Sequence, residues 1–168
     1  MLIALAGLPG TGKSTLARGL GRSLRAPVLS VDPIEAALLR AGVHETQPTG
    51  LAAYVVAEAL AERQLELGLP VVLDAANYVE PGRQMWRDLA TRRGVALRWI
   101  ETVCSDEALH RARLDERGAY IPGLGAVTWP DVLRRRAETD PWADARLVVD
   151  TAEPTEACLA RALAYLGR

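Results

Sequence analysis

Short runs of apolar, often β-branched residues alternate along the chain with longer stretches in which apolar residues recur every three or four positions. The short runs are typical of buried strands, and the longer spacing is typical of amphipathic helices. This alternation predicts parallel strands joined by crossover helices. The predicted strands are Leu2–Ala6, Val28–Val31, Val71–Asp74, Ala96–Val103 and Arg146–Val149. The predicted helices are Lys13–Leu24, Pro33–Ala41, Leu51–Leu67, Pro81–Arg93, Asp106–Arg117, Asp131–Glu138 and Thr155–Leu166.

Two stretches interrupt this rhythm and are predicted to be loops. Val43–Gly50 is polar and contains Pro48, and Ala119–Pro130 contains two glycines and two prolines. The second stretch directly follows an arginine-rich helix, so a lid is predicted around residues 106–130. With 168 residues and no low-complexity linker, the chain is predicted to form a single domain.

Composition narrows the possible partners and the compartment. A net charge of −1 and a pI near 6.1 give no bulk attraction to nucleic acid or to an anionic membrane. A polynucleotide substrate is therefore disfavoured, although a local basic groove is left open. Cys104 and Cys158 match no metal spacing and are expected to be reduced thiols. Because no signal peptide or membrane-length apolar run is evident, a cytoplasmic protein is expected.

The most informative local feature is the glycine-rich segment between the first strand and the first helix. Its glycines allow successive backbone N–H groups to turn toward one point, at which the following helix directs its positive dipole end. Lys13 is expected to reach the β- and γ-phosphates of a nucleoside triphosphate, and the Ser14 hydroxyl to bind Mg²⁺. The predicted triphosphate-binding residues of this segment are Gly7, Pro9, Gly10, Thr11, Gly12, Lys13, Ser14 and Thr15.

Three polar residues follow predicted strands, at the sheet edge where ligands of open α/β folds bind. Asp32, after the second strand, is predicted to accept a proton from a substrate hydroxyl or to help hold Mg²⁺; the alternative is a helix cap. Asp74 ends the third strand and resembles the Walker B acid that orients Mg²⁺; the alternative is a turn residue. Asn77 is predicted to contact substrate, although asparagine is also common in turns.

Arginines crowd the predicted helix before the second loop. Arg113 and Arg117 are four residues apart and share a face, whereas Arg111 points elsewhere. Such a pair can stabilise the negative charge of a phosphoryl transition state, and Arg117 is also expected to contact the nucleotide. The alternative is a solvated helix with local ion pairs. Thr151, in the loop after the last strand, is expected to lie beside the glycine loop and contact the nucleotide.

The remaining aromatic and imidazole side chains give weaker predictions. Trp86 and Trp99 are expected in the core, while Trp129 or Trp142, each next to a proline, could stack on a planar substrate. Both histidines match no triad or metal set and are predicted to be ordinary surface groups.

The order of these motifs resembles that of the small P-loop kinases, over nearly the whole chain. The resemblance rests on Gly7–Thr15, Asp32, Val71–Asn77 and Arg113–Arg117. It is greatest to the AAA-type subgroup that includes polynucleotide 5′-kinase domains, chloramphenicol phosphotransferase and zeta toxins, and is more distant to gluconate and shikimate kinases. The resemblance implies a three-layer P-loop NTPase sandwich, an α/β fold whose five-stranded parallel sheet has the order 2-3-1-4-5. It also implies Mg-ATP as donor, a hydroxyl acceptor, Asp32 as general base and the arginine helix as lid.

One departure bears on the acceptor. Polynucleotide kinases tend to have an arginine shortly after the acid of the second strand, and here Glu35 stands near that position. The favoured hypothesis is an ATP-dependent phosphotransferase that acts on a hydroxyl of a small molecule. A nucleotide or polynucleotide 5′-OH kinase is the alternative within enzymes. A nucleotide-dependent switch ATPase without an acceptor is the alternative from another class.

Overall fold

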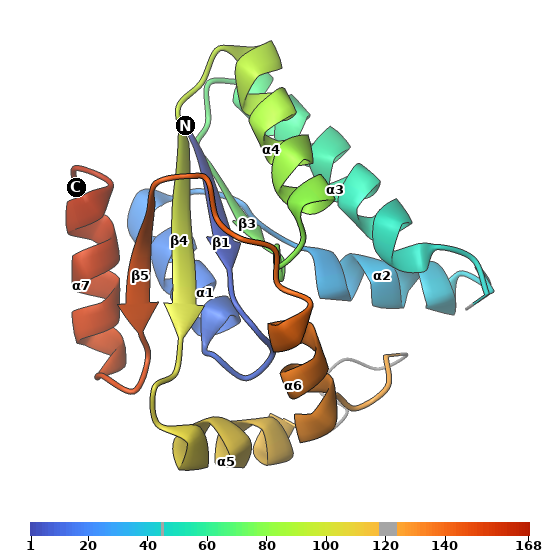
Figure 1. The fold of residues 1–168 in the computed structure, drawn as a ribbon. Coiled ribbons are helices and arrows are strands. Elements are labelled where there is room, and N and C mark those ends of the chain that lie inside the picture. Colours follow the sequence, from blue (N-terminus) through green and yellow to red (C-terminus); the bar gives the residue numbers. More distant parts are fainter. Residues whose placement is uncertain (45, 118–123) are drawn as a thin grey trace.

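Five parallel strands form one sheet in the order β2-β3-β1-β4-β5 (Figure 1). The computed structural model describes residues 1–44, 46–117 and 124–168, and of Arg117 only the backbone. The strand order predicted from the family resemblance is confirmed. The strands are β1 (Leu2–Ala6), β2 (Val28–Ser30), β3 (Val71–Asp74), β4 (Leu97–Val103) and β5 (Arg146–Asp150).

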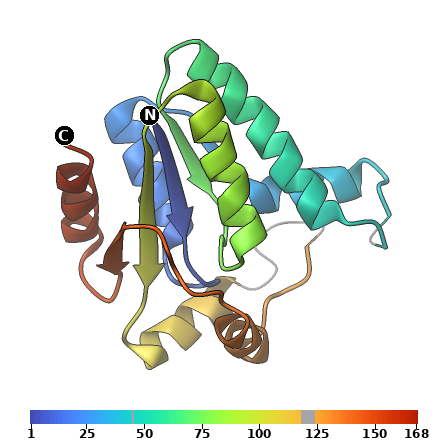
Figure 2. The same ribbon diagram turned by 45° about the horizontal axis from the view of Figure 1, so that its top comes forward.

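Helices cover both faces of the sheet, and two further helices lie beyond the ends of the strands (Figures 1 and 2). In both views α3 and α4 lie on one face and α1 and α7 on the other, while α5 and α6 lie past the tips of the arrows. The helices are α1 (Lys13–Leu24), α2 (Val31–Arg40), α3 (Thr49–Glu66), α4 (Glu80–Arg93), α5 (Glu107–Arg117), α6 (Trp129–Ala137) and α7 (Thr155–Tyr165).

Side chains of the central strand β1 alternate between two apolar cores. Leu2 and Ala4 belong to the core formed with α3 and α4, whereas Ile3 and Leu5 belong to the core formed with α1 and α7. All four are fully buried, as expected for a parallel strand covered on both faces. This burial fixes β1, and it therefore also fixes the loop that leaves the carboxyl end of β1. Among the described residues, no helix is both long and apolar enough to cross a membrane.

The boundary between β2 and α2 differs from the prediction. The strand ends at Ser30, and the helix begins at Val31, two residues before Pro33. The first turn of a helix accepts proline because its N–H groups have no partners within the helix. Asp32 therefore lies in the first turn of α2 instead of ending the strand.

The predicted lid region is described only in part. Residues 118–123 lie outside the described residues, and irregular chain from residue 124 leads to Thr128, the N-cap of α6. The Asp131 side chain accepts hydrogen bonds from the backbone N–H and the hydroxyl of Thr128, which holds the pKa of Asp131 at about 2. The start of α6 is therefore fixed by a capping box.

Small residues set the distance between α3 and the sheet. Ala53, Ala57 and Ala61 recur every four residues, are fully buried, and belong to the core with β1 and β3. Their small side chains allow α3 to approach the strands closely. The substitution Ala57→Leu should therefore lower the free energy of unfolding by about 1–3 kcal/mol through overpacking. Chemical denaturation of Ala57→Leu and of Ala59→Leu, at an exposed position of the same helix, measures the difference. Equal effects of the two substitutions would contradict this packing.

Candidate functional site

The loop between β1 and α1 has a conformation that requires glycine. Gly7 has φ +146°, and a Cβ atom there would lie 2.4 Å from Oγ1 of Thr102. The Thr11 hydroxyl donates to the carbonyl of Leu8 at 2.7 Å and lies 2.9 Å from the Thr102 hydroxyl. The loop is thus held against β4 by buried threonines, and any side chain at Gly7 would displace it.

The ammonium group of Lys13 faces the carboxylate of Asp74 at the start of α1. The distance from Nζ to Oδ1 is 3.4 Å, and only 10% and 6% of the two side chains are exposed. The Ser30 hydroxyl donates a hydrogen bond to Oδ2 of Asp74 at 3.0 Å. Three segments predicted to lie at the sheet edge therefore meet at Asp74: the glycine loop, the end of β2 and the end of β3.

A divalent cation fits this edge only if it takes ligands from a bound phosphate. Within the described ranges, no three His, Cys, Asp or Glu side chains lie close enough to hold a metal ion. Oδ1 of Asp74 is buried and accepts no hydrogen bond from any described residue. Mg²⁺ typically uses one or two carboxylates together with phosphate oxygens and water. The donor set of Ser14 and Asp74 suits such an ion.

Asp32 lies near a phenol with a perturbed pKa. Burial raises the pKa of Tyr54 to about 12, and the negative charge of Asp32 adds to the effect. The Tyr54 hydroxyl also accepts a hydrogen bond from the backbone N–H of Asn77 at 3.3 Å, which opposes the shift. At neutral pH Tyr54 is therefore a neutral hydrogen-bonding group beside Asp32.

The side chain of Asn77 makes internal contacts and is 1% exposed. Its amide nitrogen donates to the carbonyl of Leu5 at 2.6 Å, and its oxygen accepts from Nε1 of Trp86 at 2.9 Å. Its φ of +51° is the left-handed conformation that asparagine tolerates. Asn77 thus ties the end of β1 to α4, and this geometry does not support the predicted contact between its side chain and a substrate.

Arg113 joins α5 to the loop that follows β5. Its guanidinium donates to the hydroxyl of Thr151 at 3.0 Å and to the carbonyl of Thr151 at 2.9 Å. The Thr151 hydroxyl in turn donates to the carbonyl of Thr11 in the glycine loop at 3.0 Å. Arg113 and Thr151 are therefore brought to the glycine loop, as the sequence predicts. The side chain of Arg117 lies outside the described part of the chain.

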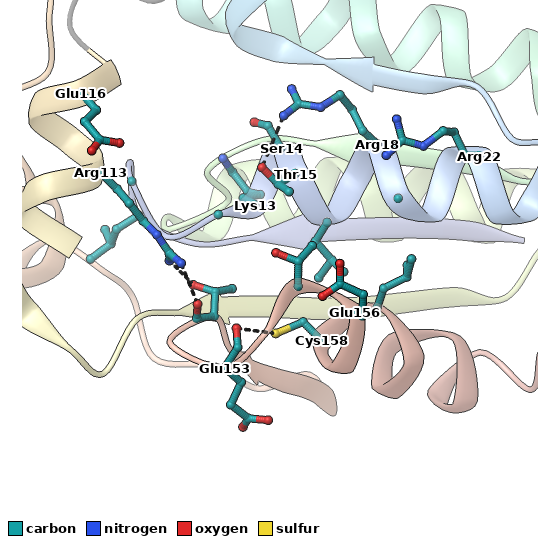
Figure 3. A pocket seen from close by; sticks show the side chains of 18 residues that line it. Lys13, Ser14, Thr15, Arg18, Arg22, Arg113, Glu116, Glu153, Glu156 and Cys158 are labelled. Carbon is teal, nitrogen blue, oxygen red and sulfur yellow. Dashed lines mark hydrogen bonds between the residues drawn. The ribbon is translucent and has the colours of Figure 1, made fainter. Parts of the chain in front are cut away.

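A cavity of about 660 Å³ lies beside the glycine loop (Figure 3). Its walls come from the loop, the first turns of α1, Arg113 of α5, the segment after β5 and the start of α7. Lys13, Ser14 and Thr15 line it at the end formed by the loop, and Glu156 lines it on α7 (Figure 3). The cavity has the volume of a pocket for a ligand of nucleotide size.

His110 is another residue whose position differs from the prediction. His110 was expected at the surface, but it is 1% exposed, and its Nε2 lies 2.7 Å from the carbonyl oxygen of Pro9 in the glycine loop. The sequence contained a signal: His110 stands four residues before Leu114 and thus shares a helix face with this buried residue. The other histidine, His44, is exposed as expected.

The tryptophans follow the predictions in part. Trp86 and Trp99 are buried in the core, as expected. Trp142 packs against Trp99 with ring centroids 5.3 Å apart, and Trp129 packs against His110. The Arg111 guanidinium also lies 4.5 Å from the Trp129 ring centre. Both rings that were candidates for substrate stacking therefore already pack on protein groups.

Comparison with known proteins agrees with this architecture. A family model described as "AAA domain" matches residues 2–123. No curated protein is significantly similar in sequence. A protein of Chloroflexus aurantiacus described as a candidate kinase is 24% identical, with a TM-score of 0.78, over 99% of this chain and 95% of its own.

Two other solved structures resemble this chain more weakly in sequence. The APS kinase of Mycobacterium tuberculosis, in complex with AMPPNP and APS, is 17% identical with a TM-score of 0.71, over 99% of this chain and 97% of its own. A gluconokinase of Sinorhizobium meliloti is 21% identical with a TM-score of 0.66, over 99% and 91%. At identities this low, the structural similarity establishes a shared fold and no more. Together with the family match over most of the chain, it leads to one conclusion: the chain belongs to the AAA-domain family and has the fold of the small P-loop kinases.

Proposed function

We propose that this chain is an ATP-dependent kinase that transfers the γ-phosphate of Mg-ATP to a hydroxyl group of a small molecule. The observation that carries the proposal is the meeting of Lys13, Asp74 and the glycine loop at one end of a cavity of nucleotide size. A buried ammonium next to free loop amides attracts phosphate oxygens. The whole chain would act as one kinase domain, with a lid around residues 106–130.

ATP would lie along the cavity, with its phosphates in the loop. Backbone N–H groups of Gly10, Gly12 and Lys13, together with the hydroxyls of Ser14 and Thr15, would surround the phosphates. The remaining length of the cavity, between Arg113 and the start of α7, would hold the nucleoside. The structure of the M. tuberculosis APS kinase, a protein of the same fold, contains AMPPNP, which supports a nucleotide as the ligand.

Magnesium would supply charge neutralisation on the phosphates and help orient them. Ser14 would hold the ion directly, and Asp74 would hold it or one of its waters; Asp32 is the alternative acid. Oδ1 of Asp74 accepts no hydrogen bond from described residues, which supports Asp74 over Asp32 as the acid near the ion. Lys13 would stay close to Asp74 and would also bind the phosphate oxygens.

Asp32 would act as the general base toward the acceptor. Two groups that can exchange protons lie close together here, Asp32 and Tyr54. Because the pKa of Tyr54 is raised to about 12, the phenol stays protonated at neutral pH and cannot take a proton from the acceptor. The carboxylate of Asp32 at the first turn of α2 is the remaining candidate. Tyr54 would serve to hold the segment at Asn77.

Arg113 and Arg117 would close over the triphosphate and exclude water, which would otherwise hydrolyse ATP. Arg113 lines the cavity and is held beside it by its hydrogen bonds to Thr151 in the segment after β5. The acceptor would enter between Asp32 and the lid. Two free thiols, Cys104 and Cys158, suit the reducing cytoplasm in which we place the protein.

Removal of the ammonium group tests the phosphate site. Lys13→Ala should reduce kcat/KM for ATP turnover by about 100-fold or more, because a preorganised charge at the transferred phosphoryl group is lost. The matched control is Arg98→Ala, which removes an exposed cation of β4, near the strand end away from the loop. ADP release in a coupled assay measures turnover, and circular dichroism checks the fold. Phosphotransfer retained in folded Lys13→Ala would refute this role.

A second substitution separates base catalysis from metal binding. Asp32→Asn should lower kcat by about 100- to 10,000-fold, because proton transfer from the acceptor loses its base. The affinity for ATP should change little. The control Asp88→Asn removes an exposed carboxylate from α4. Titration calorimetry with ATP and magnesium, alongside an ADP-release screen over sugars, nucleosides and amino alcohols, provides both readouts. A collapse of ATP affinity in Asp32→Asn would mean that this acid mainly holds the metal or the structure.

A further inference from the structure

A buried imidazole holds one carbonyl of the glycine loop. Nε2 of His110 lies 2.7 Å from the carbonyl oxygen of Pro9, and the side chain is 1% exposed. A carbonyl oxygen can only accept a hydrogen bond, so the hydrogen must be on Nε2 of the ring. His110 therefore donates to the loop from α5, across about 100 residues of sequence.

This hydrogen bond determines where the neighbouring amide points. The peptide bond between Pro9 and Gly10 is trans, so the carbonyl of Pro9 and the N–H of Gly10 point in opposite directions. Because the carbonyl of Pro9 points toward His110, the N–H of Gly10 points away from the imidazole, and Gly10 itself lines the cavity beside the loop. In the described part of the chain this N–H has no hydrogen-bond acceptor. It is thus available to an anion.

The imidazole also fills the space next to Gly10. This glycine has φ +83°, and a Cβ atom added to it would lie 2.9 Å from Cδ2 of His110. The ring therefore supports the loop from outside by contact as well as by its hydrogen bond. A rotation of the peptide between Pro9 and Gly10 would have to break the hydrogen bond.

The other side of the imidazole contacts α6. The rings of His110 and Trp129 lie edge to face with their centroids 5.1 Å apart. The guanidinium groups of Arg111 and Arg136 lie 4.5 and 5.8 Å from the centre of the Trp129 ring. Figure 2 shows α5 and α6 crossing below the loop between β1 and α1. A continuous set of contacts thus runs from α6 through His110 to the glycine loop.

We propose that His110 is a positioning residue that orients the peptide between Pro9 and Gly10 for binding the β-phosphate, and that it links this orientation to the docking of α5 and α6. The inference rests on the proposed nucleotide site. According to this inference, His110 contributes to the affinity for phosphate and does not contact the nucleoside. ADP, which has a β-phosphate, should therefore depend on His110 much more than AMP does.

Two substitutions at one position test the proposal. His110→Leu removes the donor but keeps an apolar side chain of similar bulk, whereas the amide nitrogen of His110→Gln can still donate to the carbonyl of Pro9. Titration calorimetry should show His110→Leu to bind ADP on the order of tenfold more weakly, the cost of one lost buried hydrogen bond. His110→Gln should recover most of this affinity, and AMP affinity should change little in either variant. His44→Leu, at the exposed histidine, is the matched control.

The outcomes separate this inference from the proposed function. If wild-type protein binds ADP and His110→Leu binds it equally well, the positioning role is wrong. Equal losses for ADP and AMP, or a loss that His110→Gln does not recover, would reduce His110 to a packing residue and overturn the proposal. If wild-type protein fails to bind ADP, nucleotide binding itself is contradicted, and the inference falls with it.

Should the variants not fold, ¹⁵N-labelled wild-type protein keeps the proposal testable. Its NMR spectrum should show the His110 hydrogen on Nε2 and a change in that signal with ADP that AMP does not produce. A hydrogen on Nδ1 alone, or equal changes with both nucleotides, would overturn the assignment.

Discussion

The site depends on a buried ion pair at the point where the sheet ends. Lys13 and Asp74 face each other with little exposure to water, and Ser30 binds the far oxygen of the same carboxylate. Removing one partner of such a pair leaves an uncompensated buried charge, which typically costs about 3–5 kcal/mol. The pair thus holds the Lys13 side chain in place while no phosphate is bound. A bound triphosphate would offer Lys13 a second set of anionic partners without taking it out of its position.

Further hydrogen bonds connect the glycine loop next to this pair with other elements at the sheet edge. Thr151 makes hydrogen bonds to the glycine loop and to Arg113, so the segment after β5 and α5 are both connected to the loop. His110 makes a second connection from α5 to the loop, at the carbonyl of Pro9. Because Arg113 and His110 both belong to α5, a displacement of this helix would change the contact with Pro9 directly and the contact of Thr151 with the loop indirectly. The fold therefore connects α5, which belongs to the predicted lid, to the glycine loop through protein groups that are in contact.

Much of this arrangement was predictable from the sequence. The alternation of apolar runs predicted the elements, and the motif order predicted the sheet order through the family resemblance. Lys13 and Asp74 were both predicted to lie at the carboxyl edge of the parallel sheet, but their ion pair was not predicted. Here the local pattern and the tertiary structure agree because the loop's conformation is specified by its own glycines.

Other features depend on contacts between residues far apart in sequence. The start of α2 at Val31 could not be read from Pro33, because a proline is accepted at several positions of the first helical turn. The Asn77 side chain points into the protein, where it makes hydrogen bonds to the carbonyl of Leu5 in β1 and to the Trp86 indole. His110 is buried because its imidazole makes a hydrogen bond to a backbone carbonyl, a partner that triad and metal-site spacings do not reveal. Such partners can be recognised only once the strands and helices are assembled.

Lys13 is the only lysine of the sequence, which makes one measurement direct. An acyl phosphate derivative of ATP transfers its acyl group to an amine that lies beside the terminal phosphate. If the account is right, mass spectrometry after a short incubation with magnesium will find the acyl group on Lys13, and excess ATP will prevent the modification. Folded protein in which Lys13 stays unmodified, or is modified equally in the presence of ATP, would contradict a triphosphate site in the glycine loop.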